Sequence, residues 1–179
     1  MLVDLSVRDF VAAVASAETP VPAGGSVVAL SGACAAALLA LVCDVTQRHQ
    51  PGVLTDERQN AERLQRLLMK LIDEDAAAYL AFLATRRGTD DRQAAVNRVA
   101  ATPLAMGRAC ADLVGLSRMV EAHTRGPLQG DIRTARHLAQ AGVRTAVDLA
   151  EQNLELQPDA SARRALEAEI THLRATLAS

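Results

Sequence analysis

The feature that most constrains this chain is the segment from Val27 to Cys43, which contains no charged side chain. Small residues, mostly alanine, are mixed in it with leucine and valine, so a helix made from it is apolar on every side. Such a helix has to be surrounded, and small side chains at three- and four-residue spacings let neighbouring helix backbones approach closely. The segment therefore predicts a buried core helix in a packed helical bundle.

The same segment raises the question of a membrane span. Its length lies at the lower end of the range of about 17–25 residues that spanning helices need. It also contains Ser31 and Gly32, and Asp44 ends it without flanking basic residues. These features favour a buried core helix, and we expect no membrane association. Because a bundle this small leaves part of the helix uncovered, we expect a self-complementary homodimer to cover the rest.

Composition favours helices over sheets throughout the chain. Of the 179 residues, 50% are hydrophobic but only 2% are aromatic, and alanine and leucine take the place of the missing aromatics. Sheets prefer β-branched and aromatic residues, whereas this balance is typical of closely packed helices. No segment alternates apolar and polar residues as a strand does. We therefore predict an all-α fold in a single domain over residues 1–179.

Turn and cap signals divide the chain into one short N-terminal helix and about five long helices. We expect these helices at residues 6–16, 26–49, 55–86, 90–123, 131–156 and 158–177. Ser6, Thr55 and Asp131 are predicted as N-caps. Pro20–Gly25 is predicted as a loop, and Pro103 is expected to kink the fourth helix.

Charge and cysteine usage exclude several classes of function. The net charge is −2 and no basic stripe appears, so we expect no nucleic-acid partner. The first ten residues carry acids where a secretory signal would carry bases, which favours a cytoplasmic location. Cys34, Cys43 and Cys110 form no C-x-x-C pair and are predicted to be small buried residues. With histidines that lack ligand spacing, no metal site is predicted.

A turn rich in proline and glycine, "TPVPAGGSVV", precedes the apolar segment. At the start of a long helix, Gly24, Gly25 and Ser26 would present free backbone N–H groups at the positive end of the helix dipole. Such a site attracts an anion, a carboxylate or an electron-rich heterocycle. The alternative is that the two glycines only make a tight loop and that Ser26 caps the helix.

One acid in "DEDAAAYLAF" (residues 73–82) lies on the apolar side of its predicted helix. At about 100° per residue, Asp75 falls within the stripe of leucine, alanine and phenylalanine, with Tyr79 one turn further on. Asp73 falls on the opposite, solvent side. Burial raises the pKa of a carboxyl group towards neutrality, which suits a proton carrier. Asp75 is therefore a candidate catalytic residue, and the alternative is an ion pair with an arginine from another helix.

Two further polar residues belong to the fifth predicted helix. Asp131 follows Gly130 and precedes an alanine-rich segment, which is the pattern of an N-cap. Asn153 falls on the apolar stripe of the same helix, where a buried amide needs partners. Those partners are either a neighbouring backbone or a ligand.

Several segments together resemble the family of formiminotetrahydrofolate cyclodeaminases and methenyltetrahydrofolate cyclohydrolases. The matching segments are residues 10–46, 71–82, 102–110, 130–142 and 153–154. The first segment is the most specific, because the turn with its two glycines and serine and the small-residue helix occur together. The segments follow the order of the family and span nearly the whole chain.

The resemblance implies an all-α homodimer with a folate site in a cleft that involves both subunits. It also implies chemistry on the one-carbon unit bridging N5 and N10 of tetrahydrofolate, without a metal or redox cofactor. Asp75 would then act as the general acid–base group, with Asp131 joining it from the start of its helix. The Gly24–Ser26 turn, Tyr79 and Asn153 would bind the substrate.

The chain also departs from the pattern of that family. Ala23 stands where the family has a third glycine, and Leu149 stands where it has an asparagine. A lysine-containing loop is replaced by "LATRRGTDD", so only Arg86 or Arg87 can take over the lysine's role, more easily in binding than in catalysis. These departures leave open an alternative, a folate-binding or scaffold homodimer that has lost turnover. A helical interaction protein unrelated to folate is the third alternative.

Overall fold

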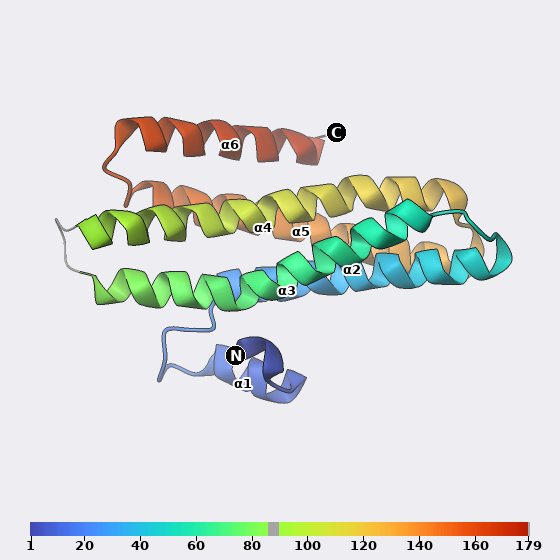
Figure 1. The fold of residues 1–179 in the computed structure, drawn as a ribbon, viewed down its shortest axis with the longest axis horizontal. Helices are drawn as coiled ribbons and strands as arrows, with labels where there is room; N and C mark the ends of the chain where they lie inside the picture. The colour runs from blue at the N-terminus through green and yellow to red at the C-terminus, as the bar shows by residue number, and fades with distance from the viewer. Residues whose placement is uncertain (86–89, 179) are drawn as a thin grey trace.

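The computed structural model describes residues 1–85 and 90–178 (Figure 1). All regular secondary structure in these residues is helical. The helices are α1 (Val7–Ala15), α2 (Gly24–His49), α3 (Thr55–Ala84), α4 (Asp90–His123), α5 (Gln129–Leu154) and α6 (Ala160–Ala178), with short 3₁₀ helices at Leu2–Asp4 and Gly126–Leu128. The all-α prediction, with one short helix and five long ones, is confirmed.

Helices α2 to α5 form the bundle (Figure 1). α2 packs against α3 and α5, α4 packs against the same two helices, and α6 lies over α4 and α5. Successive helices run in opposite directions. The beginnings of α2 and α4 therefore lie at the same end of the bundle as the ends of α3 and α5.

Helix α2 is one of the four bundle helices, and much of it is buried as its composition predicts, but its outward side is not covered within one chain. It contacts three other long helices, and its small residues lie against them; a Cβ atom on Gly32 would lie 3.1 Å from a methyl carbon of Leu68. Segments within α2 and α4 are long and apolar enough to cross a membrane by length and composition alone, yet 61% of each segment is buried within the protein. Cys43 and Cys110 are buried as predicted. Cys34 is exposed, contrary to the prediction, because it lies on the outward side of α2.

The first predicted cap is confirmed and the second is wrong. Ser6 precedes α1, and its hydroxyl accepts a hydrogen bond from the Asp9 N–H at 3.2 Å. Thr55 is the first residue of α3 instead of its cap, because Leu54 adopts a left-handed conformation with φ of 62° and starts the helix from the backbone. Its carbonyl accepts the first helical hydrogen bond, from the N–H of Arg58.

The predicted cap at Asp131 is also wrong. α5 begins two residues earlier, at Gln129, because the 3₁₀ helix Gly126–Leu128 leads directly into it. Asp131 is therefore in the first turn of α5, where a negative charge still interacts favourably with the helix dipole.

Candidate functional site

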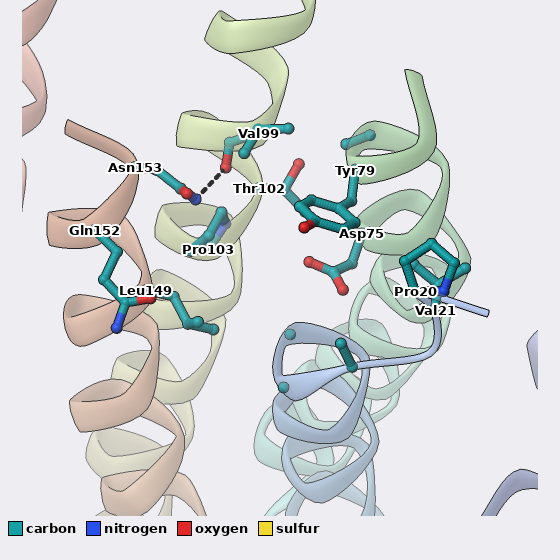
Figure 2. Close-up of a pocket in the computed structure, with 14 residues that line it drawn as sticks. Pro20, Val21, Asp75, Tyr79, Val99, Thr102, Pro103, Leu149, Gln152 and Asn153 are labelled. Carbon is teal, nitrogen blue, oxygen red and sulfur yellow. Dashed lines mark hydrogen bonds between the residues drawn. The ribbon is translucent and has the colours of Figure 1, made fainter. Parts of the chain in front are cut away.

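A cavity of about 220 Å³ opens where α2 and α4 begin and α3 and α5 end. Its walls come from all four helices and from the segment before α2 (Figure 2). Most of the lining is apolar. The side-chain polar groups among the described residues that line it are those of Asp75, Tyr79, Thr102, Gln152 and Asn153.

The beginning of α2 forms one side of this cavity. The helix begins at Gly24, so Gly24 and Gly25 are its first two residues, and the prediction that they belong to a loop is wrong. Ala23 precedes the helix in an extended conformation, with φ of −134°, which alanine adopts without strain. The backbone conformation at this position therefore does not require the third glycine of the family pattern. The first N–H groups of α2 have no acceptor within the helix, and Ala23, Gly24 and Gly25 all line the cavity.

The two glycines face different surroundings. A Cβ atom on Gly25 would lie 2.1 Å from Oδ1 of Asp75, so only glycine allows the carboxylate to approach the helix this closely. A Cβ atom on Gly24 would meet no atom within 4 Å. Gly25 is thus required by the protein itself, whereas Gly24 leaves space open on the cavity side.

Asp75 is half-buried in α3 and its carboxylate projects into the cavity (Figure 2). Its placement on the apolar side of the helix is confirmed. Oδ2 accepts a hydrogen bond from the hydroxyl of Ser26 at 3.1 Å. Burial raises the pKa of Asp75 above its usual range, and hydrogen bonds from the side chain and backbone of Ser26 offset part of that rise. Among the described residues, the partner is therefore a serine from α2 and not the arginine that the sequence left open as the alternative.

Ser26 is fully buried, with 0% of its surface exposed. Its hydroxyl lies 3.1 Å from Oδ2 of Asp75 and 3.2 Å from the carbonyl oxygen of Ile72. The prediction that its side chain caps α2 is wrong. Ser26 does not line the cavity, and its role in substrate binding stays a prediction.

Tyr79 follows Asp75 by one turn and also lines the cavity. Its ring stacks on that of Phe82 with 6.3 Å between centroids. In Figure 2 the phenol lies beside the Asp75 carboxylate and points towards α4 and α5. Tyr79 is 39% exposed, which leaves part of the residue accessible to a planar ligand.

Asn153 has a backbone partner, which is one of the two alternatives that the sequence left open. Its side-chain amide nitrogen donates to the carbonyl oxygen of Val99 at 2.9 Å (Figure 2). That carbonyl is the one that residue 103 would satisfy in a regular helix, but Pro103 has no N–H. α4 continues through Pro103, and Asn153 replaces the missing donor. The amide donor of Asn153 therefore has a structural partner, and its role in ligand binding stays a prediction.

Thr102, Gln152 and Leu149 line the cavity without having been predicted as binding residues. The Thr102 hydroxyl donates to the carbonyl oxygen of Arg98 at 2.8 Å, which leaves its lone pairs for a second partner. Leu149 presents an apolar side chain towards the cavity (Figure 2). No spacing rule identifies these three residues, because they come from two helices and become neighbours only in the folded chain.

The remaining predicted site residues are Asp131, Arg86 and Arg87. Asp131 and Asn153 lie near opposite ends of α5, separated by about 33 Å at about 1.5 Å per residue, so Asp131 is far from the cavity within one chain. Arg86 and Arg87 lie outside the described residues. The described residues contain no group of three or more histidine, cysteine or acidic side chains that could hold a metal ion.

Asp73 differs from its prediction as a solvent-exposed acid. Its Oδ1 accepts a hydrogen bond from the backbone N–H of Leu2 at 2.6 Å, and its Oδ2 is buried. Asp73 thus attaches the N-terminal 3₁₀ helix to the face of α3 opposite Asp75. Glu74 does lie towards solvent, where it pairs with Lys70 at 2.8 Å.

Comparisons with known proteins match the chain to one family. Residues 6–172 match the family described as Formiminotransferase-cyclodeaminase. The chain is 29% identical over 147 residues to the methenyltetrahydrofolate cyclohydrolase of Methylorubrum extorquens, an alignment covering 73% of this chain and 71% of that protein. Its fold is similar to that of formiminotetrahydrofolate cyclodeaminase from Thermotoga maritima, with a TM-score of 0.86 and 23% identity over 99% of this chain and 92% of the other.

Proposed function

The chain belongs to the formiminotransferase-cyclodeaminase family, and on this premise we propose that it is a methenyltetrahydrofolate cyclohydrolase. In this reaction water adds to the carbon that bridges N5 and N10 of 5,10-methenyltetrahydrofolate and opens the ring to 10-formyltetrahydrofolate. The observation that carries the proposal is the half-buried carboxyl group of Asp75, which has a raised pKa and lines the cavity at the start of α2. The 29% identical relative bears the name of this activity.

The charge of the cavity suits the methenyl form of the substrate. The methenyl bridge carries a delocalised positive charge, and the described residues that line the cavity include one carboxyl group and no lysine or arginine. An opposite charge nearby favours the ionised form of a carboxyl group. Binding of the cation would therefore lower the pKa of Asp75 and convert it into the base that the first step requires.

In the proposed mechanism Asp75 moves one proton at a time. Its carboxylate takes a proton from a water molecule while the water oxygen bonds to the methenyl carbon, and the pair of electrons displaced from the C–N double bond neutralises the cation. The protonated Asp75 then gives its proton to N5. The carbon–N5 bond breaks, the hydroxyl group loses its proton, and the formyl group remains on N10. One water is consumed and one proton is released.

The second candidate is the cyclodeaminase reaction, which closes 5-formiminotetrahydrofolate to the methenyl form and releases ammonia. The description of the matching family supports it, and the same acid–base group would protonate the leaving amine. Tyr79 would stack on the pterin ring in either reaction. The N–H groups at Gly24 and Gly25 would contact its oxygen or ring nitrogens.

The third possibility is a folate-binding or scaffold protein without turnover. The sequence supports it, since Leu149 and the "LATRRGTDD" segment replace polar residues of the family pattern.

Asp131 lies far from the cavity within one chain, so it can take part in the reaction only from a second copy of the chain. The homodimer is accordingly part of this proposal.

One experiment separates the three candidates. Purified protein is incubated with 5,10-methenyltetrahydrofolate and, separately, with 5-formiminotetrahydrofolate, while the methenyl absorbance and ammonia are followed. We expect enzyme-dependent decay of the first chromophore. Appearance of the chromophore with ammonia from the second substrate would instead assign the deaminase. Inactivity on both substrates, with folate binding measured by calorimetry, would assign the binding protein, and absence of both would reject the proposal.

A further inference from the structure

The buried hydroxyl group of Ser26 has two acceptors and one proton. It lies 3.1 Å from Oδ2 of Asp75 and 3.2 Å from the carbonyl oxygen of Ile72. A hydroxyl group donates one hydrogen and accepts through its lone pairs, so it bonds fully to one of these acceptors at a time. Because Ser26 is 0% exposed, no solvent takes part in this choice.

We propose that Ser26 is a positioning residue for Asp75: its hydroxyl donates to the carboxylate while Asp75 is ionised, and turns to the Ile72 carbonyl when Asp75 carries a proton. In the second state the lone pair of Ser26 accepts the hydrogen bond from the protonated Asp75. Both protonation states then have complete hydrogen bonding without any movement of the backbone. The inference rests on the proposed function in that it treats Asp75 as the group that gains and loses a proton.

The close packing around the pair supports this role. The carboxylate lies against Gly25, where a Cβ atom would come within 2.1 Å of Oδ1, so the glycine lets Asp75 come within hydrogen-bonding distance of Ser26. The segment from Ile72 to Asp75 spans almost one helical turn of α3, so α3 supplies both acceptors to one hydroxyl of α2. A buried hydroxyl group with a single acceptor would lose its partner in one of the two states, which is costly.

Few other groups can influence the titration of Asp75. The described residues that line the cavity include one further titratable side chain, that of Tyr79 on α3. The described residues of α2, α4 and α5 that line the cavity are uncharged, and those with polar side chains are Thr102, Gln152 and Asn153. Burial causes the rise in the pKa of Asp75, and hydrogen bonds from both the side chain and the backbone of Ser26 oppose it.

The test is a titration of the Asp75 carboxyl carbon in ¹³C-aspartate-labelled protein without substrate, assigned with Asp75→Asn. Ser26→Ala removes the hydrogen bond that stabilises the carboxylate, so we expect the titration midpoint to move to higher pH. Ser26→Cys keeps nearly the same shape with a weaker donor and should give a smaller movement in the same direction. Thr171→Ala is the control, because its hydroxyl donates to the Glu167 carbonyl on α6 at 2.9 Å, away from the cavity.

A pH profile of kcat/KM on the substrate that is turned over gives the second readout. In Ser26→Ala we expect a loss of about tenfold on the acidic limb, which a lost hydrogen bond to a charged group produces, and a much smaller change on the alkaline plateau. An unchanged carboxyl titration in folded Ser26→Ala overturns the inference. If that variant does not fold, an unchanged titration in Ser26→Cys overturns it. A shifted titration in a protein that turns over neither folate supports the role of Ser26 and rejects the proposed function.

Discussion

At the scale of single residues, ionisation of Asp75 makes the folded protein less stable, which ionisation of a fully exposed acid does not. Its pKa is raised by burial, so the folded state binds the proton more tightly than the unfolded state. Between the unfolded pKa of about 3.9 and the higher folded pKa, stability therefore falls as the pH rises. At pH values above both pKa values the loss of stability is complete, and at pH values below both there is no loss.

Asp75→Asn removes this loss of stability together with the proton carrier. We expect a loss of about 10²–10⁴-fold in kcat, which is the usual contribution of a general acid–base group, with the fold retained. We also expect the variant to melt at a higher temperature than the wild-type protein at pH 7, and this difference to shrink as the pH falls towards 4. Activity assays and calorimetric melts between pH 4 and 8 measure both effects. A variant that keeps wild-type activity would show that Asp75 is not the acid–base group.

Gly24 and Gly25 form a matched pair for testing the approach of α2 to Asp75. In Gly25→Ala the new Cβ atom would overlap Oδ1 of Asp75, so the carboxylate must move and we expect at least a tenfold loss of kcat. In Gly24→Ala the Cβ atom meets nothing within 4 Å, so the fold and the position of Asp75 should be retained. Kinetics and thermal melts of the two variants provide the comparison. Equal kinetic effects would contradict the role assigned to Gly25.

Asp75 could be predicted from the sequence, whereas its partner could not. The helical repeat is a local pattern, so a short segment of sequence is enough to reveal a single acid within an apolar stripe. The bond from Ser26 depends on how α2 aligns with α3 across a separation of 49 positions in the chain. Asp73 was predicted incorrectly for the same reason, because its partner is the backbone of Leu2, 71 positions away.

At the scale of helices, α4 and α5 are joined by a hydrogen bond that compensates for a proline. Pro103 leaves the Val99 carbonyl without its helical donor, and Asn153 supplies one from α5 at 2.9 Å. Asn153→Ala should therefore destabilise the protein by about 1–3 kcal/mol, the usual cost of a buried group that loses its partner.

A double-mutant cycle isolates this compensation. Pro103→Ala restores an N–H at position 103, so the Val99 carbonyl regains a helical donor. We expect Asn153→Ala to cost much less in the Pro103→Ala background than in the wild-type protein. The free energies of unfolding of the four proteins in urea measure the coupling. Equal costs in both backgrounds would mean that Asn153 stabilises the bundle in some other way.

Helix starts were harder to predict than helix identities. Where a side chain caps the helix, as Ser6 does for α1, the sequence predicts the start correctly. α2, α3 and α5 begin without a side-chain cap, from extended, left-handed and helical conformations respectively. Backbone conformations of this kind leave no residue signature, so Thr55 and Asp131 were predicted as caps and Gly24 as a loop residue.

At the scale of the whole molecule, α2 has an outward side that α3, α4 and α5 do not cover. One stripe of partly or fully exposed residues on this side follows alternating spacings of four and three. Its members are Val27, Ser31, Cys34, Leu38, Leu41 and Val45. This spacing is the repeat of a helix that packs against another helix along a narrow apolar stripe. The composition of α2 predicts that one chain cannot bury the whole helix. The structure identifies the residues that stay exposed.

A second copy of α2, packed around a two-fold axis, would cover this stripe with an identical one. We therefore expect sedimentation at micromolar concentration to give twice the 18.9 kDa mass of one chain. Leu41→Glu places a charge on a stripe residue that is 49% exposed, so the folded chain should become monomeric without losing its helical content. Met119→Glu is the control, because Met119 is 54% exposed on α4, outside the stripe. A wild-type monomer would leave Asp131 without access to the cavity, whereas a dimer unaffected by Leu41→Glu would place the interface on another surface.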